Sequence, residues 1–166
     1  MVAVPNVPLV LPEEAQRLLE QGYTYVDVRS EPEFAEGHPV GACNVPLLRV
    51  EGDRLVDNSE FVDVMRHAFR TTDPLVIGCR SGSRSHVAAE RLREAGFGDL
   101  AELKNGFLGA RDDFGRRLPG WVQRGLPVEA GDGEARSYAR LRQRLTERGA
   151  GGKSGSRAGP GGTGQG

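Results

Sequence analysis

The chain has 166 residues, a length that suits one domain with a sizeable hydrophobic core. Hydrophobic residues make up 37% of it, and no run approaches the roughly 18 apolar residues of a membrane-spanning helix, so we expect no membrane association. Residues 1–16 have the pattern of neither a secretory signal nor an arginine-rich transit peptide. The lack of such a pattern and the presence of only two cysteines favour a cytoplasmic protein without a disulfide framework.

The net charge of −1 is unevenly distributed along the chain. Residues 1–78 carry a net charge of −7, whereas residues 79–166 carry +6. Nucleic-acid binding could explain a basic half, but the chain has no aromatic platform or reading helix, and we expect no nucleic-acid partner. A solvated surface with a basic C-terminal helix is the favoured explanation. A small anionic substrate near residue 79 is a third possibility.

Predicted helices and strands alternate along the chain. Apolar spacing and end signals indicate helices at 12–21, 31–37, 59–70, 85–95 and 134–148, with Ser59 expected to cap the third. Strand or extended segments are indicated at 7–11, 23–28, 40–46, 75–77 and 100–103. Such alternation predicts an α/β fold with a mainly parallel sheet covered by helices on both faces.

The C-terminal third departs from this alternation. Segment 109–120 is polar and turn-rich, which predicts a surface excursion. Helix 134–148 has five arginines around a narrow apolar stripe of Tyr138, Leu141 and Leu145. Half of the residues after it are glycine, which predicts disorder. We expect three parts: a main domain at 1–130, a basic helix at 131–148 and a disordered tail at 149–166.

The stretch CRSGSRS at 79–85 connects a buried strand to a helix. Ligand sites of α/β proteins lie at the carboxyl ends of strands, near helix N-termini. Gly82 allows the loop a backbone conformation that other residues resist. Cys79 is then either a thiolate held in this turn or a small buried side chain at a strand end.

The first of these alternatives requires the loop to stabilise negative charge. If the loop curls, the backbone N–H groups of Ser81, Gly82 and Ser83 point inward and form an anion cradle at the helix N-terminus. Arg80 and Arg84 would add positive charge. The thiolate interpretation of Cys79 is favoured because other segments of the chain agree with it.

Four separated segments resemble the single-domain form of the rhodanese family. They are DVRSEPEFAEGHPVGACNVP at 27–46, the loop at 79–85, and KNGF at 104–107 with WVQRGLPV at 121–128. The resemblance implies a five-stranded, mainly parallel sheet flanked by helices on both faces, and a cysteine that carries persulfide sulfur. The gap before Trp121 is longer than in compact members, a departure that affects the nearby substrate rim.

The resemblance implies a sulfurtransferase that needs no cofactor. Cys79 would take sulfane sulfur from thiosulfate or a similar anionic donor and pass it, as a persulfide, to a thiol or cyanide acceptor. Arg80 and Arg84 would bind the donor, with the backbone of residues 81–83 around the sulfur. We expect a monomer. His67 and His86 lack metal-ligand spacing, so no metal site is predicted.

Several other residues have supporting or structural roles in this prediction. Asp27 and Arg29 lie at a strand end, where they either orient the loop or form a structural ion pair. The structural ion pair is favoured. Ser85 is assigned a supporting role. His38 is expected to be a turn residue with a satisfied hydrogen bond rather than a base. Cys43 is expected to be a small buried side chain rather than the partner of a loop disulfide.

Three alternative functions remain open. The loop has four residues between Cys79 and Arg84, whereas related phosphatases have five there to surround phosphate, so phosphatase activity is the weaker enzymatic interpretation. Arsenate reduction is a lesser alternative of the same kind, since a thiol loop can bind oxyanions. A non-catalytic sulfur carrier or protein-interaction module is the rival outside enzymes. Trp121 is predicted to serve packing.

Overall fold

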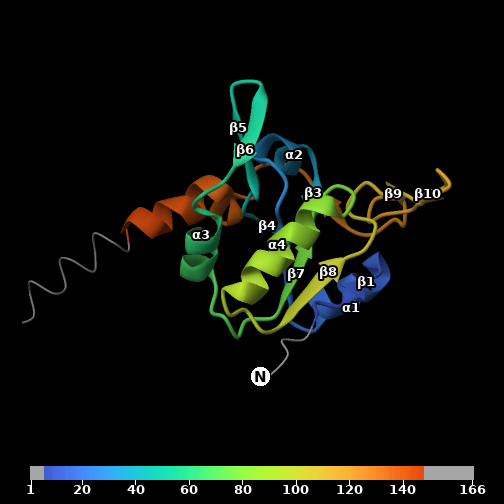
Figure 1. Ribbon diagram of the computed structural model, residues 1–166, viewed down its shortest axis with the longest axis horizontal. Coiled ribbons are helices and arrows are strands. Elements are labelled where there is room, and N and C mark those ends of the chain that lie inside the picture. The colour runs from blue at the N-terminus through green and yellow to red at the C-terminus, as the bar shows by residue number, and fades with distance from the viewer. Residues whose placement is uncertain (1–5, 148–166) are drawn as a thin grey trace, which may run out of the picture.

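The computed structural model describes residues 6–147, which form a central sheet wrapped by helices (Figure 1). Its five strands lie in the order β1-β8-β7-β2-β4. All pairings within this sheet are parallel, so the predicted sheet is confirmed. The strands are β1 Leu9–Val10, β2 Thr24–Asp27, β4 Cys43–Asn44, β7 Leu75–Gly78 and β8 Leu100–Leu103.

Helices cover both faces of the sheet, as predicted. Successive residues of a strand point to opposite faces, and the buried side chains divide accordingly into two clusters. Tyr25 and Val76 belong to the cluster that α1 covers. Val26 and Ile77 belong to the cluster that α3 and α4 cover. The helices are α1 Pro12–Glu20, α3 Phe61–Ala68 and α4 Ser83–Glu94.

A short helix, α2 (Glu31–Glu36), follows β2 and begins with a capping box. The Ser30 hydroxyl accepts the Glu33 N–H at 3.4 Å, and the Ser30 N–H donates to the Glu33 carboxylate at 3.2 Å. Two first-turn donors are thereby satisfied. The sequence analysis predicted the helical turn but not this cap.

The predicted bounds of the third helix were wrong at both ends. Helix α3 starts at Phe61, and Ser59 does not cap it. The Asn58 side chain accepts the Glu60 N–H at 3.1 Å instead, so the turn before the helix is closed from one residue earlier. The helix ends at Ala68, because the next residue is already extended.

The C-terminal helix is interrupted near its predicted start. A 3-10 turn, η1 (Glu134–Arg136), precedes an extended Ser137, and the α-helix covers 138–147. Its predicted apolar stripe packs against the cluster under α3 and α4: Tyr138, Leu141 and Leu145. Arg148 and the tail at 149–166 lie outside the described residues. Within 6–147, no helix is long and apolar enough to cross a membrane.

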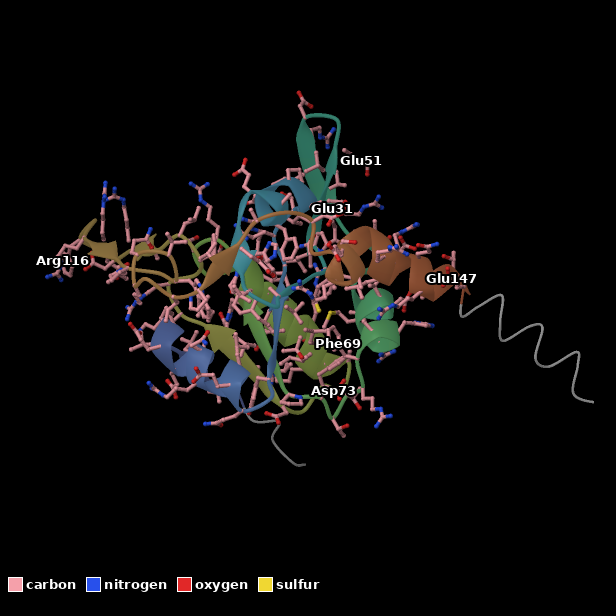
Figure 2. The ribbon with its side chains drawn as sticks, turned by 180° about the vertical axis from the view of Figure 1, so that it is seen from behind. Glu31, Glu51, Phe69, Asp73, Arg116 and Glu147 are labelled. Carbon is pink, nitrogen blue, oxygen red and sulfur yellow. The ribbon has the colours of Figure 1, made fainter. Side chains whose placement is uncertain are left out.

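Within residues 6–147, three small two-stranded sheets that were not predicted lie outside the central sheet. Hairpin β5–β6 projects from the body in Figure 1, and Figure 2 shows Glu51 at its outer end. Hairpin β9–β10 projects elsewhere on the surface and forms part of the predicted excursion 109–120. The bounds are β3 His38–Pro39 with β11 Val128–Glu129, β5 Leu48–Glu51 with β6 Arg54–Asp57, and β9 Ala110–Arg111 with β10 Arg117–Leu118.

Candidate active site around Cys79

Cys79 lies directly after β7, at the carboxyl edge of the sheet. The preceding Gly78 is in register with Asp27 at the end of β2. The Cys79 residue is only 1% exposed, beneath its own loop. Helix α4 starts at Ser83, two residues before the predicted start, because Gly82 acts as its N-cap with φ of 120°. Glycine adopts this left-handed conformation without a steric penalty.

Two backbone amides of the loop point at the sulfur. The Gly82 N–H lies 3.1 Å from Sγ of Cys79, and the Ser85 N–H lies 3.3 Å from it. The Ser85 hydroxyl lies 3.4 Å from Sγ and donates to the Gly82 carbonyl at 3.1 Å. Gly82 was predicted as a donor, whereas Ser85 was given only a supporting role. Among the described residues, the N–H groups of Ser83 and Arg84 have no acceptor.

The Arg84 side chain is bound to α2 rather than open to solvent. Its guanidinium donates to both carboxylate oxygens of Glu33, at 2.7 and 3.0 Å. Burial alone would raise the pKa of Glu33, but Arg84 and the hydrogen bonds from Ser30 outweigh it and lower the pKa to about 2. Arg84 therefore connects the loop to the capping box of α2. The sequence analysis missed Glu33, although S-x-x-E is a readable capping signal.

Asp27 and Arg29 form a buried ion pair beside the loop. Their closest atoms, Nη2 and Oδ2, are 2.6 Å apart, and the side chains are 0% and 3% exposed. The Arg29 guanidinium also donates to the Gly37 carbonyl at 2.7 Å and lies 4.5 Å from the centre of the Phe107 ring. Because Asp27 and the Gly37 carbonyl engage Nε and Nη2 of Arg29, the arrangement suits a structural role at the end of β2.

The turn at 105–109 is bonded directly to the backbone of the loop. The Phe107 N–H donates to the Cys79 carbonyl at 2.8 Å, and the Leu108 N–H donates to the Arg80 carbonyl at 3.0 Å. Gly106 has φ of 70°, and a Cβ there would overlap the Arg80 carbonyl. Only glycine permits this close approach, so the turn and the loop are fixed to each other.

Tyr25 is a buried residue of the site region that the sequence analysis did not single out. Its hydroxyl fills the space that a Cβ at Gly78 would need and has no hydrogen-bond partner among residues 6–147. Burial raises its pKa well above the ordinary value. Its ring meets the buried Trp121 edge-on, with centroids 5.8 Å apart. The predicted packing role of Trp121 is confirmed.

The remaining candidates are packed or hydrogen-bonded as the sequence suggested. His38 is buried, its Nδ1–H donates to the Phe34 carbonyl at 2.7 Å, and its Nε2 lies 3.2 Å from the Glu129 carboxylate. Cys43 is 8% exposed, and burial raises its pKa. Cys43 and Cys79 are both free thiols. Among residues 6–147, no three His, Cys, Asp or Glu side chains could together hold a metal ion.

A pocket of about 580 Å³ opens beside the loop. Arg80 and Ser81 line it together with Gln123 and with residues 108–111 and 117–119. Arg80 is exposed and makes no side-chain hydrogen bond or ion pair with another described residue. The pocket was not predicted, because it forms only when the excursion returns beside the loop.

Comparison with known proteins identifies the family of the chain. The family described as "Rhodanese-like domain" matches residues 11–112. "Thiosulfate sulfurtransferase 16, chloroplastic" of Arabidopsis thaliana is 33% identical over 116 residues, 70% of this chain and 88% of that protein. "Thiosulfate sulfurtransferase GlpE" of Pseudomonas fluorescens is 38% identical over 96 residues, 58% of this chain and 77% of that protein.

A solved structure extends the likeness to the whole fold. Rv0390 from M. tuberculosis superposes with a TM-score of 0.64 at 30% identity, covering 76% of this chain and 100% of that one. The chain spans 64% and 63% of two longer plant relatives, the senescence-associated protein DIN1 of Raphanus sativus and the rhodanese-like domain-containing protein 15 of Arabidopsis thaliana, each 36% identical. The chain belongs to the rhodanese-like family, as a single domain related to thiosulfate sulfurtransferases.

Proposed function

We propose that the protein is a sulfurtransferase that moves sulfane sulfur from thiosulfate or a similar anion to a thiol or cyanide acceptor, through a persulfide on Cys79. The observation that carries this proposal is the pair of amides, from Gly82 and Ser85, that point at the sulfur where α4 begins. Hydrogen bonds from amides and the positive end of a helix both stabilise a thiolate. Relatives named thiosulfate sulfurtransferases support the proposal.

In the first half-reaction, the Cys79 thiolate attacks the outer sulfur of thiosulfate. A bond forms between the two sulfur atoms, the bond from the outer sulfur to the sulfonate group breaks, and its electron pair leaves with sulfite. The N–H groups of Ser83 and Arg84, which have no acceptor among residues 6–147, would bind the outer sulfur of the resulting persulfide anion. The exposed Arg80 would offset the charge of the incoming donor.

In the second half-reaction, an acceptor thiolate attacks the outer sulfur of the persulfide. The bond to Cys79 breaks, and its electron pair returns to Cys79 as the thiolate. No general base is needed if the loop keeps the sulfur ionised. We further propose a monomer in the cytoplasm, because both core clusters are completed within one chain and both cysteines are free thiols.

Two-substrate kinetics test this proposal. With thiosulfate and a thiol varied together, sulfite release should give parallel reciprocal plots, the signature of a ping-pong cycle. Cys79→Ala should abolish sulfite release, while Cys43→Ala, which changes the other buried cysteine, should retain it. Equal turnover in Cys79→Ala would refute the proposal. Hydrolysis of a phosphate monoester by Cys79 without sulfite release would favour the phosphatase alternative.

A further inference from the structure

The pocket beside the loop is larger than a small inorganic anion requires. Its volume of about 580 Å³ lies within the range of about 300–1,000 Å³ that holds organic ligands. Arg80 and Ser81 directly follow Cys79, so one wall of the pocket is the active-site loop itself. Hairpin β9–β10 and the residues beside it supply the rest of the lining. An organic molecule in this pocket would contact the two residues that directly follow Cys79, although Cys79 itself does not line the pocket.

The pocket is strongly cationic. Arg80, Arg111 and Arg117 line it, and no carboxylate does. Arg111 and Arg117 are directly opposite in the hairpin, an arrangement of like charges that destabilises a strand pair. Within 6–147, the Arg117 side chain has no hydrogen-bond or ion-pair partner, and Arg111 donates only to the Gly115 carbonyl at 2.8 Å. An anion bound between them would relieve this repulsion.

The carboxylate next to Arg111 in the chain is engaged elsewhere. Asp112 accepts the N–H groups of Arg116 at 2.8 Å and Phe114 at 2.9 Å, which holds its pKa below the ordinary value, and its other oxygen pairs with the Arg116 guanidinium at 2.9 Å. Arg116 is 74% exposed and lies at the outer end of the hairpin (Figure 2). It is thus a hairpin cation that does not line the pocket.

Hydrogen bonds hold the lining segments in place, and apolar side chains line the pocket along with the charges. The Leu108 N–H donates to the Arg80 carbonyl at 3.0 Å, and the Gly120 N–H donates to the Gln123 side chain at 2.9 Å. Leu108 is 42% exposed although it lines the pocket, and Leu118 lies beside it on the hairpin wall. This combination suits a ligand with a carbon body and more than one negative group.

We propose that this pocket selects acceptor thiols that carry two carboxylate groups, an inference that rests on the proposed sulfurtransferase function. Arg111 and Arg117 would bind the carboxylates, for which the guanidinium fork is well shaped. The carbon body would contact Leu108, and the thiolate would face the Cys79 persulfide. The acceptor sulfur then bonds to the outer sulfur, and the electron pair of the broken bond returns to Cys79.

Acceptor selectivity tests the pocket. Thiosulfate serves as donor, with mercaptosuccinate, a thiol with two carboxylates, and 2-mercaptoethanol, a thiol with none, as acceptors. The kcat/KM for mercaptosuccinate divided by that for 2-mercaptoethanol should fall about tenfold in the double variant Arg111→Gln, Arg117→Gln, because two charged contacts are lost. Arg116→Gln should keep the wild-type ratio. A ratio that the double variant leaves unchanged would overturn the proposal.

Two further measurements separate this inference from the proposed function. Mass spectrometry shows whether Cys79 takes up sulfur from thiosulfate at all; if it does not, the proposed function fails on its own. Binding of S-methylmercaptosuccinate, which cannot accept sulfur, is then measured by calorimetry. Binding to wild type and Arg116→Gln, with loss in the double variant, supports the pocket. Equal binding to all three proteins, or binding to none, contradicts it.

Discussion

The Cys79 loop and hairpin β9–β10 both line one pocket but differ in the groups that serve their proposed roles. The loop contacts its sulfur with backbone amides of Gly82 and Ser85, which depend on the path of the chain more than on side chains. The hairpin contributes the side chains of Arg111 and Arg117. In the function proposed above, the sulfur chemistry depends on the path of the backbone, whereas acceptor choice depends on two hairpin side chains.

The largest expected effect comes from disturbing the backbone that holds the loop. Gly106→Ala should lower the free energy of unfolding by about 2–5 kcal/mol, because the left-handed φ strains alanine and its Cβ overlaps the Arg80 carbonyl. Denaturant unfolding measures this loss, and sulfite release should fall with it. Gly115→Ala is the matched control, with φ of 80° in open space, and should cost only about 1–2 kcal/mol. Equal losses would mean that the turn does not brace the loop.

A smaller effect is expected at the ion pair that connects the loop to α2. Glu33→Gln should lower the free energy of unfolding at neutral pH by about 1–2 kcal/mol, because the contact with Arg84 is partly exposed to solvent. Denaturant unfolding followed as a function of pH measures both this loss and its pH dependence.

The pH dependence follows from the lowered pKa of Glu33. In the folded protein it is about 2, below the ordinary 4.5, so the unfolded chain takes up the proton first as pH falls. The stabilisation is therefore complete above about pH 4.5 and is lost as pH falls towards about 2. Glu33→Gln should flatten the curve over this interval, whereas the exposed Glu31→Gln should not. Identical curves for wild type and Glu33→Gln would contradict this account.

The smallest structural effect is expected at Arg80. This exposed side chain has no partner among residues 6–147, so Arg80→Gln should change the free energy of unfolding by no more than about 0.5 kcal/mol. The KM for thiosulfate should nevertheless rise about three- to tenfold, because a positive charge near the donor is lost. Steady-state kinetics measure the change. Arg84→Gln, in contrast, should destabilise the protein, because it leaves Glu33 without its ion-pair partner. A larger loss of unfolding free energy in Arg80→Gln than in Arg84→Gln would contradict the division of roles between the two arginines.

The sequence was sufficient to predict the sheet and the position of the cysteine. Alternating apolar segments, and a glycine-rich turn after a buried strand, can be recognised from neighbouring residues alone. The structure has this predicted strand, turn and helix at β7 and α4. The start of α4 was missed by two residues, because it depends on the left-handed conformation of Gly82. That shift is what directs the Ser85 amide to the sulfur.

Long-range pairing explains most of what the sequence did not reveal. Arg84 was predicted to bind the donor, yet its guanidinium meets Glu33, a residue 51 positions earlier. The cationic pocket depends on the register that places Arg111 opposite Arg117 and on the return of the chain beside the loop. No pattern of neighbouring residues predicts the contact between Arg84 and Glu33 or the position of the hairpin beside the loop. The capping box at Ser30 and Glu33 could, however, have been recognised in the sequence as the start of α2.

The most direct test of the central claim is the mass of the intact protein after exposure to thiosulfate, followed by peptide mapping. The account predicts one added sulfur atom, located on Cys79, present in Cys43→Ala and absent from Cys79→Ala. Addition of a thiol acceptor should remove it. No added sulfur, or sulfur shared equally with Cys43, would contradict the claim that the loop amides hold Cys79 ready for sulfur transfer.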